Sequence, residues 1–141
     1  MHAGLNFEKF DHAVAALGES LSVWKDFSTG ENKNKALINT IQAGVIQNFE
    51  VAYDQCWKMM NRWLDINVGR ESLHVISRKD LFREAGAHGL ISDVSQWFNF
   101  HFARNSTSHN YSEAIALETL NLAKELHDAA QVLRKSLSKN D

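Results

Sequence analysis

Apolar residues recur every three or four positions through most of the sequence, and this spacing limits the folds that the chain can adopt. Near the N-terminus the recurring residues are Phe7, Phe10, Val14, Leu17, Leu21 and Trp24. Such spacing places side chains on one face of an α-helix, whereas a half-buried strand alternates at every second residue. The sequence also contains no proline, the residue that interrupts helices most strongly. An all-helical chain is therefore predicted.

The apolar stripes divide the chain into four long helices and one short helix. The long helices are predicted over about residues 5–27, 36–64, 92–104 and 112–137. The short helix should begin after Ser77, a capping residue, and end at Gly89. A second apolar ridge on the second helix indicates that neighbours contact it on two sides. We expect one domain over residues 1–141, an all-α four-helix up-and-down bundle with an additional short helix.

Charge and cysteine content exclude several classes of protein. The chain has 15 Lys and Arg against 17 Asp and Glu, so no global basic field draws it to nucleic acid or to a membrane. Its single cysteine, Cys56, excludes an internal disulfide and a multi-cysteine metal site, and its place on an apolar helix face favours inert packing. The first residues lack the apolar core of a signal peptide, and no apolar run reaches membrane-spanning length. We expect a cytoplasmic protein without membrane contact.

Two patterns of charged residues and histidines bear on a metal centre and on an ion-pair ladder. A di-iron bundle needs two Glu-x-x-His pairs, and Glu71 with His74 is the single match, in a predicted loop. No metal site is therefore expected. Glu50, Asp54, Lys58 and Arg62 recur every four residues along the second helix, acids first. This pattern predicts a solvated ladder of i,i+4 pairs, except that Glu50 adjoins the core and is a candidate polar anchor.

The segment "ARNSTSHNYSEA", residues 103–114, places Arg104, His109 and Tyr111 between two predicted helices. A plain connection needs only turn-forming residues and a cap. Arg104 has a structural explanation of its own, because a cation at the C-terminal end of a helix interacts favourably with the helix dipole. A fixed cation, a titratable imidazole and a phenol so close together also suit a binding site for an anion.

The chemistry of such a site can be read from these residues. The first turn of the last predicted helix offers backbone N–H groups to a phosphate. Arg104 could clamp that phosphate, and His109 could carry a proton near neutral pH. These groups suit metal-free cleavage of a phosphodiester by its neighbouring 2′-hydroxyl, with His109 moving the proton and Arg104 holding the developing charge. No second proton-transfer group is identifiable, so the structural explanation stays open.

The spacing of Arg104, His109 and Tyr111 resembles the R-x4-H-x-Y signature of the HEPT superfamily. The wider string "RNSTSHNY" is similar to the "RN…SH.Y" of its nucleotidyltransferase substrate-binding branch. Two further stretches, residues 42–64 and 78–91, are similar to that branch in the same order, although one acidic position carries Asp54 where relatives often have glutamate. Three residues lie in the matched segments and are expected to have supporting or substrate- or partner-binding roles: Asn105, Ser108 and Glu50.

The resemblance implies a partner and two alternative functions. Members of this branch are typically encoded beside a minimal nucleotidyltransferase, and the pairs behave as toxin and antitoxin. In one alternative the helical protein is an RNase acting through Arg104 and His109, and the partner silences it by transferring AMP to Tyr111. In the other it is a non-catalytic subunit that presents substrate to the nucleotidyltransferase. Nucleotide would enter through the partner, and no cofactor is expected for this chain.

A homodimer is expected on chemical grounds. One Arg104–His109 pair supplies one proton-transfer group, whereas cleavage usually needs an acid and a base. A two-fold dimer would duplicate the pair across a shared cleft. Four aromatic residues precede Arg104, and those not used by the core could form the dimer contact or a wall on which bases stack: Trp97, Phe98, Phe100 and Phe102.

Overall fold

The computed structural model describes residues 4–31, 34–109 and 113–139, and within these ranges the chain contains helices and no strand. The helices are α1 (Glu8–Thr29), α2 (Lys35–Asn67), the 3₁₀ helix η1 (Arg70–Ser72), α3 (Arg78–Ala87), α4 (Val94–His109) and α5 (Glu113–Lys139). The all-α bundle of four long helices with a short additional one is therefore confirmed. No helix in the described ranges is long and apolar enough to span a bilayer.

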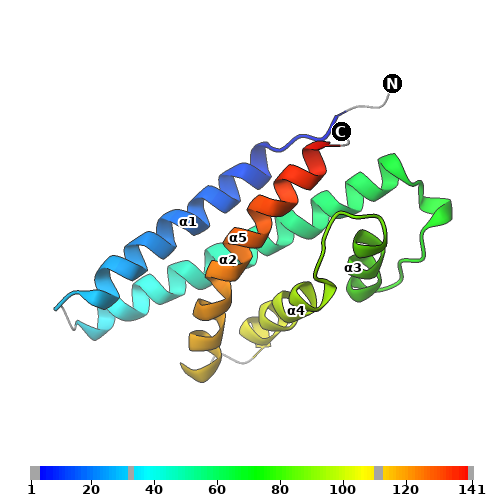
Figure 1. The fold of residues 1–141 in the computed structure, drawn as a ribbon. Coiled ribbons are helices and arrows are strands. Elements are labelled where there is room, and N and C mark those ends of the chain that lie inside the picture. Colours follow the sequence, from blue (N-terminus) through cyan, green and yellow to red (C-terminus); the bar gives the residue numbers. More distant parts are fainter. Residues whose placement is uncertain (1–3, 32–33, 110–112, 140–141) are drawn as a thin grey trace.

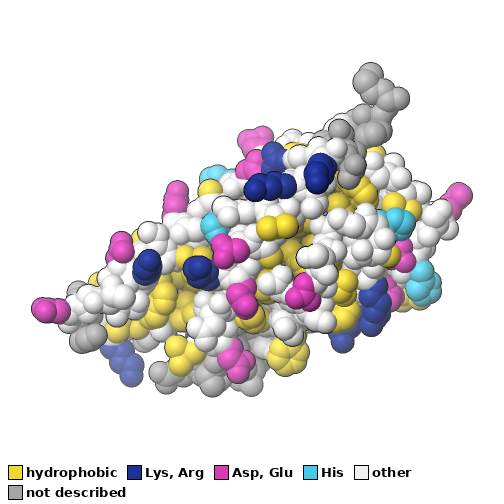
Figure 2. Space-filling model, viewed as in Figure 1, with side chains coloured by type: hydrophobic (Ala, Val, Ile, Leu, Met, Phe, Trp, Pro, Cys, Tyr) yellow, Lys and Arg dark blue, Asp and Glu magenta, His cyan; other side chains and the backbone are white. Residues whose placement is uncertain are grey.

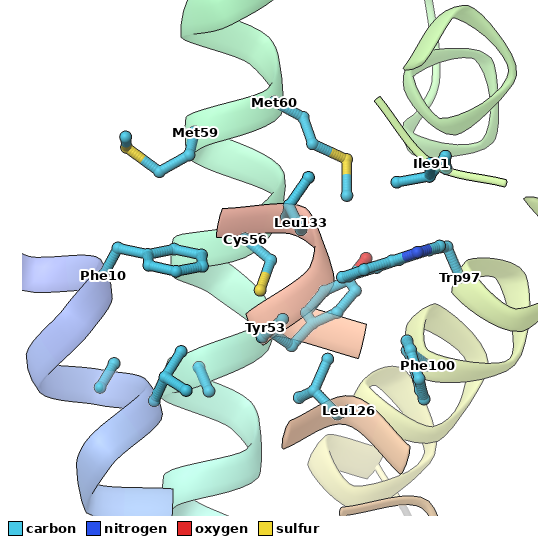
Figure 3. Close-up of a cluster of buried hydrophobic side chains, with 14 of the residues drawn as sticks. Phe10, Tyr53, Cys56, Met59, Met60, Ile91, Trp97, Phe100, Leu126 and Leu133 are labelled. Carbon is cyan, nitrogen blue, oxygen red and sulfur yellow. The ribbon is translucent and has the colours of Figure 1, made fainter. Parts of the chain in front are cut away.

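The second helix, α2, is the centre of the molecule. It contacts α1 and α5 as well as α3 and α4 (Figure 1). This arrangement explains why its sequence carries two apolar ridges, as predicted. The core spreads to both sides of α2: Figure 3 shows Phe10 of α1 on one side and Trp97 and Phe100 of α4 on the other. Burying a side chain of this size stabilises the fold by about 1.5–3 kcal/mol.

The short helix α3 begins and ends where its sequence predicts. The hydroxyl of Ser77 accepts a hydrogen bond from the backbone N–H of Asp80 at 3.2 Å, and the carboxylate of Asp80 accepts one from the N–H of Ser77 at 3.3 Å. This reciprocal capping box satisfies two N–H groups that the first turn would otherwise leave unpaired. Gly89 has φ +81°, a conformation that glycine adopts without strain, and it ends the helix.

Helix α4 is longer than predicted. The helix was expected to end near Arg104, but α4 continues to His109. Asn, Ser and Thr disfavour a helix by only tenths of a kcal/mol per residue. Ala103 is 6% exposed and packs in the core, and Arg104 is bound by side chains of α2, so these tertiary contacts outweigh the local preference. The predicted caps of the last helix, Asn110 and Ser112, lie outside the described residues.

The buried cysteine is a packing residue, as its place on α2 indicated. Cys56 on α2 is fully buried, and Figure 3 shows it among the other side chains of the core. Burial raises the pKa of its thiol far above the usual range, so the reactive thiolate is suppressed.

Acidic and basic side chains are interspersed over the face seen in Figure 2, in keeping with the balanced charge.

Candidate functional site

Arg104 lies on the face of α4 that is turned toward α2, between two carboxylates. Its Nη1 donates to Oε2 of Glu50 at 2.5 Å, and its Nη2 lies 3.5 Å from Oδ2 of Asp54. Glu50 and Asp54 are one turn apart on α2, so both can reach the same guanidinium. The three side chains are 27%, 19% and 34% exposed, respectively, for Arg104, Glu50 and Asp54. The site is therefore an oriented cation that is partly shielded from water.

The ion-pair ladder predicted along α2 is wrong at Asp54. Asp54 pairs with Arg104 on α4, and among the described residues no ion pair joins it to Lys58. The ammonium of Lys58 lies 5.8 Å from the centre of the Trp57 ring instead. Charges that are partly buried attract each other more strongly than exposed ones, which favours the contact between helices over the contact along one helix.

A second polar contact joins α2 to α4 one turn away. The hydroxyl of Tyr53 lies 2.7 Å from Nδ1 of His101, and Nη1 of Arg78 on α3 donates to the same hydroxyl at 3.3 Å. The guanidinium of Arg78 is stacked 3.5 Å above the Trp57 ring. Tyr53 is 1% exposed, and burial raises the pKa of its phenol to about 12. Tyr53 therefore keeps its proton at every physiological pH.

His101 is a residue of the site that the sequence did not single out. It stands three residues before Arg104 on α4, and its Nε2 lies 3.3 Å from the side-chain amide nitrogen of Asn105. Burial, and then the charges of Arg78 and Lys79, lower the pKa of His101, so the ring is neutral at neutral pH. One signal in the sequence could have revealed it. His101 and Arg104 are three residues apart, and so are their partners Tyr53 and Glu50.

The structure brings together some of the predicted site residues. Arg104 meets Glu50 directly, and Asn105 contacts His101 on the same helix. Ser108 and His109 belong to the last turn of α4, but their side chains lie outside the described part of the structure, as does Tyr111 as a whole. The described site is therefore the arginine end of the R-x4-H-x-Y motif together with the residues of α2 and α3 that hold it.

The aromatic residues before Arg104 divide between the core and the surface. Trp97 and Phe100 are buried in the core, whereas Phe102 is 71% exposed. Phe98 is half-buried, and Lys79 and Arg83 of α3 lie 5.5 Å and 5.4 Å from its ring centre. Two of the four aromatics are thus core residues and Phe102 projects into solvent.

Among residues 4–31, 34–109 and 113–139, no group of three or more His, Cys, Asp or Glu side chains is arranged to hold a metal ion. The acids of the site, Glu50 and Asp54, are bound to Arg104. The chemical resources of this region are therefore a guanidinium, an imidazole and an amide, all of which can donate hydrogen bonds to an anion.

The all-helical fold of this chain is that of a class of nucleotidyltransferase substrate-binding proteins. The chain matches the family model "Nucleotidyltransferase substrate binding protein like" over residues 5–139, and it belongs to this family. The resemblance identified from the three sequence segments is thereby confirmed.

The chain is similar in sequence to a known protein and in fold to solved structures. The chain is 32% identical over 114 residues to the probable ribonuclease HepT of Haemophilus influenzae, a match covering 80% of this chain and 78% of that one. The structure of HI0074 from Haemophilus influenzae, with the fold of a substrate-binding domain of a nucleotidyltransferase, superposes with a TM-score of 0.85 at 28% identity, covering 94% of this chain and 99% of that one. A protein structure from Thermus thermophilus shares the fold, with a TM-score of 0.62, 20% identity and coverage of 86% and 98%.

Proposed function

We propose that this protein is a HEPT-type, metal-independent endoribonuclease in which Arg104 and His109 are the catalytic residues. The observation that carries the proposal is the placement of Arg104, the first residue of the motif, between Glu50 and Asp54. Two carboxylates on one helix fix the direction of the guanidinium before any substrate arrives. A guanidinium has five N–H donors, enough to serve these carboxylates and a phosphate oxygen. The similarity to a probable ribonuclease supports the same reading.

The reaction that these residues suit is transesterification within the RNA strand. His109 removes the proton of the 2′-hydroxyl, and the 2′-oxygen attacks the adjacent phosphorus. The bond from phosphorus to the 5′-oxygen breaks, and this oxygen takes up a proton from water or from the second His109 of a dimer. The products are a 2′,3′-cyclic phosphate on one fragment and a 5′-hydroxyl on the other. Arg104 holds the charge that grows on the non-bridging oxygens, so the scheme needs no metal ion.

The proposed partner is a minimal nucleotidyltransferase, with this chain as the toxin of a toxin–antitoxin pair in the cytoplasm. The family's own description, a substrate-binding protein of a nucleotidyltransferase, supports such a pairing. The partner would supply the nucleotide and transfer AMP to Tyr111. An added phosphate within a few residues of Arg104 would compete with RNA for the same guanidinium. The modification would therefore inhibit by occupying the site.

A homodimer belongs to the same proposal. The exposed Phe102 lies on α4 just before Arg104, where a contact between two copies would bring two motifs to one cleft. An isologous dimer would present every motif residue twice. Sedimentation at micromolar concentration measures this directly, and a monomer would contradict it.

The alternative function is a non-catalytic subunit that presents substrate to the nucleotidyltransferase. The family description and the HI0074 fold favour it. Its electrostatic support is that Glu50 and Asp54 together outweigh the single charge of Arg104, an arrangement that also suits a structural ion pair.

One experiment separates the two functions. Purified protein is incubated with tRNA and mRNA in the presence of chelator, beside its His109→Ala variant. The RNase proposal requires cleavage by the wild type, cyclic phosphate ends and no cleavage by the variant. Intact RNA at every protein concentration, combined with a stable complex with the nucleotidyltransferase, would instead support the binding subunit.

A further inference from the structure

We propose that His101 is a second functional imidazole of the Arg104 site, held neutral with its proton on Nε2, which it donates to a phosphate oxygen bound beside Arg104. The substrate phosphate in this inference rests on the proposed function, whereas the state of the ring does not. The inference assigns a role to a histidine outside the R-x4-H-x-Y motif.

The two polar contacts between α2 and α4 are neighbours, about one helical turn apart. Glu50 and Tyr53 are three residues apart on α2, and their partners Arg104 and His101 are three residues apart on α4. Residues at this spacing lie on one face of a helix, with Cβ atoms about 5–6 Å apart. The guanidinium and the imidazole are therefore neighbours, and each is oriented by a side chain of α2. A phosphate reaching Arg104 comes within one helical turn of His101.

The hydroxyl of Tyr53 decides which ring nitrogen of His101 carries the proton. This hydroxyl accepts a hydrogen bond from Arg78 and, being buried, must also donate its own proton. The acceptor in reach is Nδ1 of His101, at 2.7 Å. A neutral imidazole that accepts at Nδ1 carries its proton on Nε2. His101 thus presents an N–H donor on the side away from Tyr53.

The side chain of Asn105 accepts the hydrogen bond from this N–H group when no substrate is bound. The Nε2 atom lies 3.3 Å from the side-chain amide nitrogen of Asn105. A half-turn of this amide exchanges its nitrogen and oxygen and places the oxygen there as the acceptor. Asn105 is exposed, so its side chain can move aside when a phosphate oxygen arrives. The exchange replaces one acceptor of the Nε2 proton by another.

The surroundings of His101 keep the ring neutral. Tyr53 faces it from α2, and Phe82 packs edge-on against it from α3. Of the charged groups, Arg78 and Lys79 on α3 oppose a positive charge on the ring and, after burial, lower its pKa. The acids Glu50 and Asp54 on α2 are bound to Arg104 on α4. Protonation would also place a second proton against the hydroxyl of Tyr53 and disrupt that contact.

In this scheme Arg104, His109 and His101 have different roles in the reaction. Arg104 supplies positive charge, His109 moves the proton, and His101 donates a hydrogen bond without changing its charge. A neutral donor can be placed beside an arginine without the electrostatic repulsion that an imidazolium would cause.

The state of the ring is tested by nitrogen-15 NMR of the histidine side chains at pH 7.5. Comparison with His101→Gln assigns the signals of His101. We expect a protonated Nε2 and an unprotonated Nδ1 in the wild type, and a mixture of both tautomers in Tyr53→Phe. A proton fixed on Nδ1 in the wild type, or an unchanged spectrum in Tyr53→Phe, would overturn the inference whether or not the protein cleaves RNA.

The donor role is tested by a matched pair of variants. In His101→Gln the amide nitrogen reaches the position of Nε2, whereas in His101→Asn the amide ends near Nδ1. We expect His101→Asn to lower kcat for RNA cleavage about 100-fold, the usual effect of removing one oriented donor, with little change in KM. His101→Gln should recover most of this loss. Equal activity of the two variants would contradict the donor role. Circular dichroism is used to check that both variants are folded.

A second measurement applies if the wild type cleaves no RNA, in which case the proposed RNase function fails. Inorganic phosphate and a 2′-O-methyl oligonucleotide, which cannot be cleaved, are titrated into nitrogen-15 labelled protein. A shift of the Nε2 signal of His101 that is lost in Arg104→Ala supports the shared phosphate site. An unmoved signal at the highest concentrations of both ligands overturns it.

Discussion

The two sides of α2 are built from different kinds of contact. Toward α1 and α5 the contacts are mostly apolar, with Phe10, Leu17 and Leu133 almost fully buried. Toward α3 and α4 the core continues, but its edge carries a chain of polar groups that includes Tyr53 and Arg104. Apolar burial stabilises the fold with little demand on orientation. Burying charge costs free energy unless its partners are well placed, so the polar side chains at this edge are held in fixed orientations.

The largest expected effect on stability lies on the apolar side. Phe10→Ala removes a ring that is 1% exposed and packed between α1 and α2, and it should lower the free energy of unfolding by about 3–5 kcal/mol. Urea denaturation followed by circular dichroism measures this change. The RNase activity per folded molecule should stay close to that of the wild type. A variant that is stable but inactive would place Phe10 in the functional site.

Among the side chains that the structure describes, Arg104 on the polar side has the largest expected effect on activity. Arg104→Ala should remove about 2–4 kcal/mol of transition-state stabilisation if the guanidinium holds the developing charge. Its effect on unfolding should be smaller than that of Phe10→Ala, because Arg104 lies at the edge of the core. Glu50→Gln keeps the arginine and removes one charged partner, so it should lose less activity than Arg104→Ala. The opposite order would show that Glu50 itself takes part in the reaction.

The buried phenol of Tyr53 should make the polar side sensitive to alkali. Its pKa rises from 10.0 to about 12 on folding, so between these values the folded state holds a proton that the unfolded state has lost. Its contribution to stability is full below pH 10 and is lost as the pH rises toward 12, by roughly 2–3 kcal/mol. Unfolding curves across this range measure the loss.

Tyr53→Phe provides the control for this alkaline effect. The variant has no phenol to titrate, so its curve should lack this part of the decline while retaining the decline caused by lysines. Parallel curves for the two proteins would show that Tyr53 is ionised as easily in the folded state as in the unfolded state.

The smallest expected effect on cleavage is that of Tyr111→Phe, because the phenol takes no part in the proposed proton transfer. The variant should cleave RNA like the wild type but escape modification. Incubation with the nucleotidyltransferase, ATP and magnesium, followed by mass spectrometry, should show AMP on the wild type alone. AMP on another residue, or loss of cleavage in Tyr111→Phe, would contradict the division of roles between Tyr111 and the Arg104–His109 pair.

Local sequence was sufficient for most of the fold. The three- and four-residue spacing predicted the four long helices, and Ser77 and Gly89 predicted the ends of α3 because capping depends on neighbouring residues. The 3₁₀ helix η1 (Arg70–Ser72) was not predicted, because its segment was expected to be a loop. The R-x4-H-x-Y spacing likewise located Arg104, the centre of the candidate site. These features depend on residues within a few positions of one another, and the sequence displays them directly.

Tertiary structure decided the length of α4 and the partners of the site. Glu50 and Arg104 are 54 residues apart, and Tyr53 and His101 are 48 apart. Nothing in a local pattern states that these residues meet, because the pairing depends on how α2 and α4 pack. Because of this packing, α4 continues through a segment of turn-forming residues, and Asp54 pairs with Arg104 and not with Lys58. The same packing places the hydroxyl of Tyr53 against His101 and so selects the tautomer of the ring. In each case a contact between helices outweighs the weaker preferences of the local chain.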